Sequence, residues 1–187
     1  MITAGNGWSW NYKNERLGIY LSTDEGRSQF FFTHYGTADL YDPPKSSAAF
    51  CCEDARLLAA YEEGLTRIGL DESGSLDLGL NGVACERFVR PAIPMTRHFM
   101  SYDRNFNAET GTVVTVYTVK GKAGDCLVLE DQDIDGLCRL MLLNPELMLP
   151  TGRAIKLGGM IRVNPHMICP FRVYSGSGMD GDTARYA

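Results

Sequence analysis

The chain has 187 residues, of which 44% are hydrophobic and 22% are charged, and its formal net charge is −5. These values are typical of a folded protein with one large domain or two small ones. No apolar run approaches the roughly 18–20 residues of a membrane-spanning helix, and the N-terminal sequence lacks the basic and apolar regions of a signal peptide, so we expect a cytoplasmic protein that does not contact a membrane.

Three short stretches near the N-terminus, residues 8–12, 16–22 and 28–33, predict an antiparallel β-meander. A helix is expected from about Glu53 to Ile68, where apolar residues recur at helical spacing. A second helix is expected at about 75–89, and its glycines, Gly79 and Gly82, should each weaken it by about 1 kcal/mol relative to alanine. Two helices can cover one face of the meander, which gives an N-terminal α/β domain.

Beyond residue 90 the pattern changes to short strands separated by glycines. The expected strands cover residues 112–119, 126–129, 137–143, 154–157 and 160–163. They predict a twisted, barrel-like β domain. The fold class is therefore α+β, with an N-terminal domain over residues 1–90, a C-terminal domain over 91–174, and a polar, glycine-rich tail over 175–187 that we expect to be mobile.

The most informative segment is RFVRPAIPMTRHF, residues 87–99, where three arginines lie beside apolar residues and no acid occurs. Pro91 and Pro94 exclude an ordinary helix through the segment, so the chain should run extended there. Such a surface suits a partner peptide with an apolar centre and acidic flanks. On these residues alone, a solvated linker between domains is an equally good interpretation.

The basic residues of the C-terminal half are also separated from the acids. Residues 147–179 contain Arg153, Lys156, Arg162 and Arg172 and no acidic residue, which indicates a local basic surface on an acidic protein. This surface is too small, and the protein too acidic, for general affinity for nucleic acids.

The sequence contains no P-loop, dinucleotide-binding or serine-nucleophile motif. The six cysteines form no C-x-x-C pair, so we expect reduced, partly buried thiols and no zinc site. The acids at 130–135 resemble a calcium loop, but Leu142 stands where such a loop needs a glutamate, so we interpret them as a solvated hairpin loop. We expect neither a metal ion nor a cofactor.

Four segments in this order resemble the ZapC family of bacterial cell-division proteins: W-x-W-x-Y near the start, AFCCEDARLLAAYEEG in the first helix, LGLNGVACERFVRPAIPMTRHF across the boundary, and GRAIKLGGMIRV near the end. The resemblance covers roughly residues 7–170. It implies an α/β N-terminal domain joined to a barrel-like β domain, no enzymatic activity, and a place at the midcell division site.

The resemblance also implies a partner, the tubulin-like GTPase FtsZ, whose filaments such proteins bind and associate laterally. An apolar pocket with a basic rim in the C-terminal domain is expected to hold the FtsZ C-terminal tail. Matching basic positions are Arg87, Arg90, Arg153 and Arg162. The full candidate site is Arg87, Arg90, Ile93, Arg97, Phe99, Arg153, Lys156 and Arg162. Met95 stands where the family has a lysine and Arg97 where it has an aromatic residue, so the basic rim is redistributed here.

Bundling of filaments requires a second contact or self-association, and the sequence does not distinguish these.

Two alternatives of other functional classes stay open. The first is a small β-barrel nucleic-acid-binding protein, for which Phe99 and Tyr102 are the nearby aromatic candidates and which the net charge opposes. The second is an enzyme with a cysteine nucleophile, such as Cys51 or Cys52 before the first helix.

Overall fold

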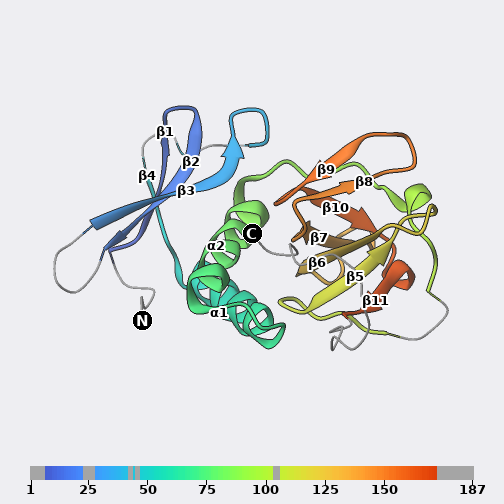
Figure 1. Ribbon diagram of the computed structural model, residues 1–187. Coiled ribbons are helices and arrows are strands. Elements are labelled where there is room, and N and C mark those ends of the chain that lie inside the picture. The colour runs from blue at the N-terminus through green and yellow to red at the C-terminus, as the bar shows by residue number, and fades with distance from the viewer. Residues whose placement is uncertain (1–6, 23–27, 42–43, 45–46, 103–105, 172–187) are drawn as a thin grey trace.

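In the computed structural model, the described residues are 7–22, 28–41, 44, 47–102 and 106–171. They form two α-helices between two antiparallel sheets, which confirms the α+β class (Figure 1). The expected mobile tail at 175–187 lies outside the described residues. No helix in the described part of the chain has the length and apolar character needed to cross a membrane.

The N-terminal sheet has four strands in the order β3-β2-β1-β4. The strands are β1 (Ser9–Lys13), β2 (Arg16–Ser22), β3 (Ser28–Gly36) and β4 (Ser47–Ala49). The alternating residues Trp10, Leu17, Ile19 and Leu21 are all buried on the face that meets the helices. The predicted meander is confirmed, and β4 adds a strand that was too short to show a period in the sequence.

Both predicted helices are confirmed. Helix α1 spans Cys52–Arg67 and helix α2 spans Glu72–Phe88, whose N-cap Asp71 accepts a hydrogen bond from the amide of Gly74. The two interior glycines of α2 permit close packing, because a Cβ atom on Gly79 would lie 2.9 Å from Leu58 and one on Gly82 would lie 2.9 Å from Tyr61. These glycines therefore lower the helix propensity of α2 but allow the two helices to lie close together.

The C-terminal part contains a five-stranded antiparallel sheet in the order β10-β7-β6-β5-β11, and a separate two-stranded ribbon, β8-β9. The sheet strands are β5 (Val113–Tyr117), β6 (Ala123–Glu130), β7 (Cys138–Leu142), β10 (Met160–Val163) and β11 (Ile168–Pro170). The ribbon strands are β8 (Glu146–Met148) and β9 (Ala154–Lys156). The sheet does not close on itself, since β10 and β11 are its two edges, so the barrel-like part of the expectation is corrected to an open sheet.

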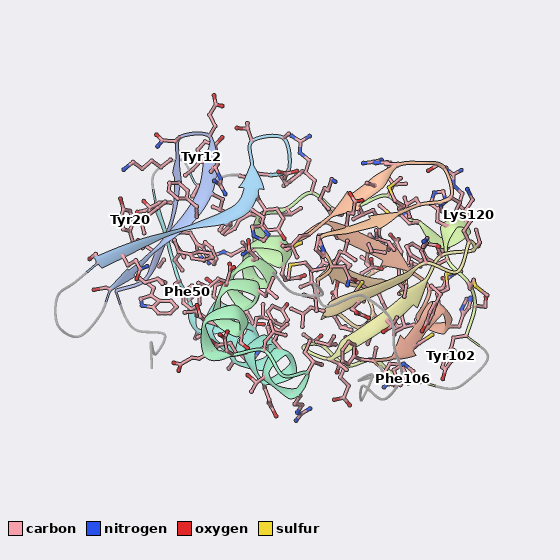
Figure 2. All side chains as sticks on the ribbon, in the orientation of Figure 1. Tyr12, Tyr20, Phe50, Tyr102, Phe106 and Lys120 are labelled. Atoms are coloured by element: carbon pink, nitrogen blue, oxygen red, sulfur yellow. The ribbon has the colours of Figure 1, made fainter. Side chains whose placement is uncertain are left out.

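Helix α2 is buried against both parts of the molecule, with α1 beside it. One continuous core joins the inner face of the N-terminal sheet, the helices and residues of the second sheet such as Leu127 and Met141. A second core lies on the other face of that sheet, where Leu147 and Ile155 of the ribbon pack on Leu140 and Ile161. Figure 2 shows side chains filling the space between the helices and the sheets. The division into two domains near residue 90 stays a prediction.

Candidate functional site

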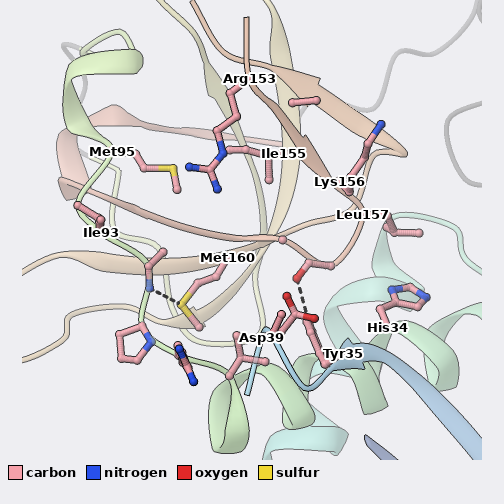
Figure 3. Close-up of a pocket in the computed structure, with 18 residues that line it drawn as sticks. His34, Tyr35, Asp39, Ile93, Met95, Arg153, Ile155, Lys156, Leu157 and Met160 are labelled. Atoms are coloured by element: carbon pink, nitrogen blue, oxygen red, sulfur yellow. Dashed lines mark hydrogen bonds between the residues drawn. The ribbon is translucent and has the colours of Figure 1, made fainter. Parts of the chain in front are cut away.

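A cleft of about 510 Å³ lies where the N-terminal sheet, the segment after α2 (residues 89–95) and the β8-β9 ribbon meet (Figure 3). Its lining comes from three stretches of the chain, within residues 34–39, 89–95 and 153–160. This volume is within the range of pockets that bind ligands in proteins. Four of the eight candidate residues line it, namely Arg90, Ile93, Arg153 and Lys156.

Hydrogen bonds at both ends hold the segment after α2 across the cleft. At its start, the amide of Arg90 donates to the carbonyl of Asp39 (2.9 Å) and the Arg90 Nε donates to the carbonyl of Leu40 (2.8 Å). At its end, the amide of Met95 donates to the carbonyl of Arg162 in β10 (2.8 Å). Because the prolines at 91 and 94 prevent helix formation, these contacts fix an irregular strip of chain as one wall. A short 3-10 helix, η1 (Thr96–His98), follows it.

The opposite wall is the ribbon and the turn that leads from β9 to β10. The Tyr35 hydroxyl, from β3, donates to the carbonyl of Gly158 in this turn (2.8 Å). Gly158 has φ +78°, and a Cβ atom there would lie 3.1 Å from the His34 ring, so the turn favours glycine on both counts. The N-terminal sheet thus helps to position the C-terminal wall of the cleft.

The cleft has a positive charge in a protein whose net charge is −5. Arg90, Arg153 and Lys156 line it, and Asp39 is the one acid among its described lining residues. Lys156 is bound by Glu146 of β8 (2.5 Å), whereas Arg153 has no ion-pair partner among the described residues. Figure 3 shows the Arg153 side chain pointing toward Met95. Arg90 likewise pairs with no acid in the described part of the chain, so Arg153 and Arg90 keep their charge for a ligand, whereas the charge of Lys156 is partly neutralised.

Apolar side chains lie beside these cations. Ile93 is 82% exposed, and Met95, Ile155 and Met160 line the cleft with it. An exposed isoleucine beside arginines can contribute apolar area when a partner covers it, at about 25 cal/mol per Å². The cleft can therefore hold a ligand that combines apolar and acidic groups.

The other candidate residues lie outside the cleft lining. Arg87 donates to the carbonyl of Ala49 (3.1 Å) and forms an ion pair with the buried Asp54 of α1. Arg97 is exposed in η1 and donates to the ring of His98 (3.3 Å). Phe99 is buried in the second core, so its ring is not presented at the surface for stacking on a nucleobase.

Arg162 differs most from the expectation, which treated it as a surface residue. It is 8% exposed, and its guanidinium binds Asp133 and Asp135 as well as the carbonyl of Ala92 (3.2 Å). The acids at 131–135 lie in the solvated hairpin loop between β6 and β7, as expected, except that the Asp133 side chain is buried against Arg162, while Asp135 pairs with the same guanidinium and is 63% exposed. Arg162 supports the segment after α2 from behind and does not line the cleft.

The environment of Asp133 favours its charged form. Partial removal from water raises its pKa, but the amides of Leu137 and Asp135 and the Arg162 guanidinium stabilise the carboxylate, and the pKa lies below its ordinary value of 3.8. The pair with Arg162 is therefore fully ionised near neutral pH.

Sequence patterns did not indicate the lining residues that come from β3 and the loop after it. His34, Tyr35 and Asp39 lie 50 or more residues before the other two lining stretches, and no spacing rule connects them. Within the described residues, no group of histidine, cysteine and acidic side chains is placed to hold a metal ion. The six cysteines are free thiols, with Cys51 and Cys52 exposed at the start of α1 and the other four buried.

Comparison with known proteins gives a consistent result. Residues 1–90 match the family model described as "Cell-division protein ZapC, N-terminal". The chain is 28% identical over 174 residues to the cell division protein ZapC of Musicola paradisiaca, with 90% of this chain and 89% of the relative covered. It is 27% identical to ZapC of Aeromonas hydrophila, covering 90% and 92%, and 25% identical to ZapC of Photobacterium profundum, covering 91% and 93%.

Proposed function

We propose, from the premise that this chain belongs to the ZapC family of cell-division proteins, that it binds FtsZ filaments at midcell and promotes their lateral association. The family supports a role in cell division. At the site, the cleft holds the C-terminal tail of FtsZ and catalyses no reaction on it.

The observation that carries this proposal is the composition of the cleft. Three cations line it together with the exposed Ile93 and the half-buried Met95, in a chain that is acidic as a whole. A flexible tail with an apolar centre and acidic residues is complementary to such a surface. The apolar groups supply desolvation, and the arginines supply charge-assisted hydrogen bonds and a faster association rate.

A single cleft of this size holds one filament weakly, because ordering a flexible tail opposes its binding. Lateral association requires that one particle contacts two filaments, through self-association or a second surface. We therefore expect bundling to depend more steeply on protein concentration than binding does.

Co-sedimentation with GTP-assembled FtsZ tests the proposal. The chain should pellet with full-length FtsZ and thicken its filaments in electron micrographs, and it should pellet far less with FtsZ that lacks its tail. Raising the salt concentration should weaken the binding, because the rim charges are solvent-exposed. Equal pelleting with tail-less FtsZ would exclude the tail as the contact. No pelleting at low salt would contradict FtsZ binding altogether.

A further inference from the structure

The cleft contains a strand edge that pairs with no other described strand, as the hydrogen bonds of the ribbon show. In the ribbon register, the amide of Leu149 donates to the carbonyl of Arg153, and the amide of Leu157 donates to the carbonyl of Pro145. In an antiparallel pair, residues alternate between those bonded to the partner strand and those whose backbone groups point away from it. The residues of β9 that point away from β8 are therefore Ala154 and Lys156.

Of the four backbone groups on this outer edge, three have no hydrogen-bond partner within the part of the chain that the structure describes. The carbonyl of Lys156 accepts the amide of Gly159 in the turn (2.8 Å). The amide and carbonyl of Ala154 and the amide of Lys156 have no hydrogen-bond partner among the described residues. Both residues line the cleft.

The neighbouring edge of β10 is different, because it is already covered. Its outward-facing carbonyl of Arg162 accepts the amide of Met95, and the amide of Ala92 lies 3.4 Å from the sulfur of Met160. The segment after α2 thus protects β10 and leaves the edge of β9 open. Natural proteins generally cover or charge such edges, since an open edge is a template for another strand.

We propose that the ligand of this cleft is an acidic peptide that binds as an extended strand added to the outer edge of β9. The amide and carbonyl of Ala154 and the amide of Lys156 make the main-chain hydrogen bonds. The inference rests on the proposed function for the identity of the partner and adds to it the backbone conformation of the bound tail and the strand that receives it.

The side chains around β9 fit this mode of binding. Successive residues of a strand point to opposite faces, so an added strand also divides its side chains between two faces. Figure 3 shows Arg153 and Ile155 on the side of Met95, with Lys156 pointing away from them. Each face of the added strand would therefore meet one cation, and the Ile155 face would also meet apolar side chains. A strand of three residues makes few bonds, which agrees with a weak contact.

The test uses Ala154→Pro in the full chain. Proline removes the outward amide and places its ring there, whereas the bonds to β8 come from the residues on either side. We expect the melting temperature to stay near that of the unchanged protein and the affinity for a synthetic FtsZ tail peptide to fall about tenfold or more. The matched control is Ala154→Val, which keeps the amide and suits a strand, and it should bind within about threefold.

Amide hydrogen exchange of the unchanged protein, followed by NMR with and without the peptide, gives a second measurement. The amides of Ala154 and Lys156 should become protected, even if the proline variant fails to fold. If these amides gain no protection, or if Ala154→Pro binds normally while Arg153→Glu does not, strand addition is overturned and the cleft stays the binding site. If the peptide binds both variants as it binds the unchanged protein, the proposed function of the cleft fails as well.

Discussion

The guanidinium of Arg162 is held by the carboxylate of Asp133, with its Nε donating to Oδ2 over 2.8 Å, and both side chains are at most one-tenth exposed. The same guanidinium donates to the carbonyl of Ala92 in the segment after α2. A buried pair that also supports a wall of the cleft has a structural role, and its loss should change the stability of the protein before it changes ligand binding.

Arg162→Glu should therefore destabilise the protein by about 3 kcal/mol or more, because it places three carboxylates together and leaves the Ala92 carbonyl without its donor. Urea denaturation measures this change. Arg97→Glu makes the same change of charge at an exposed position and should alter the free energy of unfolding by no more than about 0.5 kcal/mol. Equal stabilities for the two variants would show that the Arg162–Asp133 pair is not the support described here.

Substitution of Asp54 should destabilise the protein as much as substitution of Arg162, because three donors meet at the buried Asp54 carboxylate. Its Oδ2 accepts from Trp10 Nε1 (3.0 Å) and from the amide of Cys51 (3.0 Å), and it pairs with Arg87. Asp54→Ala should cost about 3 kcal/mol or more in the free energy of unfolding. Glu53→Ala, one residue earlier, removes only an exposed pair with Arg56 and should cost less than about 1 kcal/mol. A cost for Asp54→Ala no larger than this control would contradict the assignment.

Gly64 should be required for the packing of α1. A Cβ atom there would lie 1.8 Å from the carbonyl oxygen of Gly111, a backbone atom that cannot rotate away. Gly64→Ala should lower the melting temperature by several degrees despite the higher helix propensity of alanine. In Gly74→Ala the new Cβ would meet the Asp71 side chain at 3.1 Å, and this milder variant is the comparison. If the two variants have the same melting temperature, the close approach of α1 to the Gly111 carbonyl is wrong.

The partly buried Glu86 should make the free energy of unfolding depend on pH. Burial raises its pKa above the ordinary 4.5, although the neighbouring Arg139 lowers it in part. The stability that this group contributes is complete below pH 4.5 and is lost as the pH rises through the folded-state pKa. Relative to the unchanged protein, Glu86→Gln should therefore become more stable in urea denaturation as the pH rises from 4.5 through the folded-state pKa. A relative stability that falls over this interval would reverse the sign and contradict the burial argument.

The elements that the sequence predicted are those with a clear period or composition. The alternation around Trp10 and Ile19 indicated the N-terminal sheet, and the helical spacing up to Leu65 indicated α1. Strands of three residues, such as β4 and β8, are too short to show a period. Arg162 was expected at the surface because its partners, Asp133 and Asp135, lie 29 and 27 residues away along the chain.

The candidate site was predicted only in part, because some of its residues show a pattern in the sequence and others come together only in the folded chain. The absence of nearby acids indicated Arg153 and Lys156, and the structure places them with Arg90 and Ile93 around one cleft. The contribution of Tyr35 and Gly158, and the open edge of β9, depend on the tertiary structure and on hydrogen-bond register, which composition does not contain.

The most direct test of the account compares two charge reversals in binding to an FtsZ tail peptide by calorimetry. Arg153→Glu reverses the cation that points into the cleft, and Arg97→Glu reverses an exposed arginine outside its lining. Both proteins should melt like the unchanged one, because neither arginine forms an ion pair within the described residues. Arg153→Glu should lose at least about tenfold in affinity, while Arg97→Glu should lose less than about threefold. Equal affinities for the two variants would contradict the claim that this cleft holds the acidic tail.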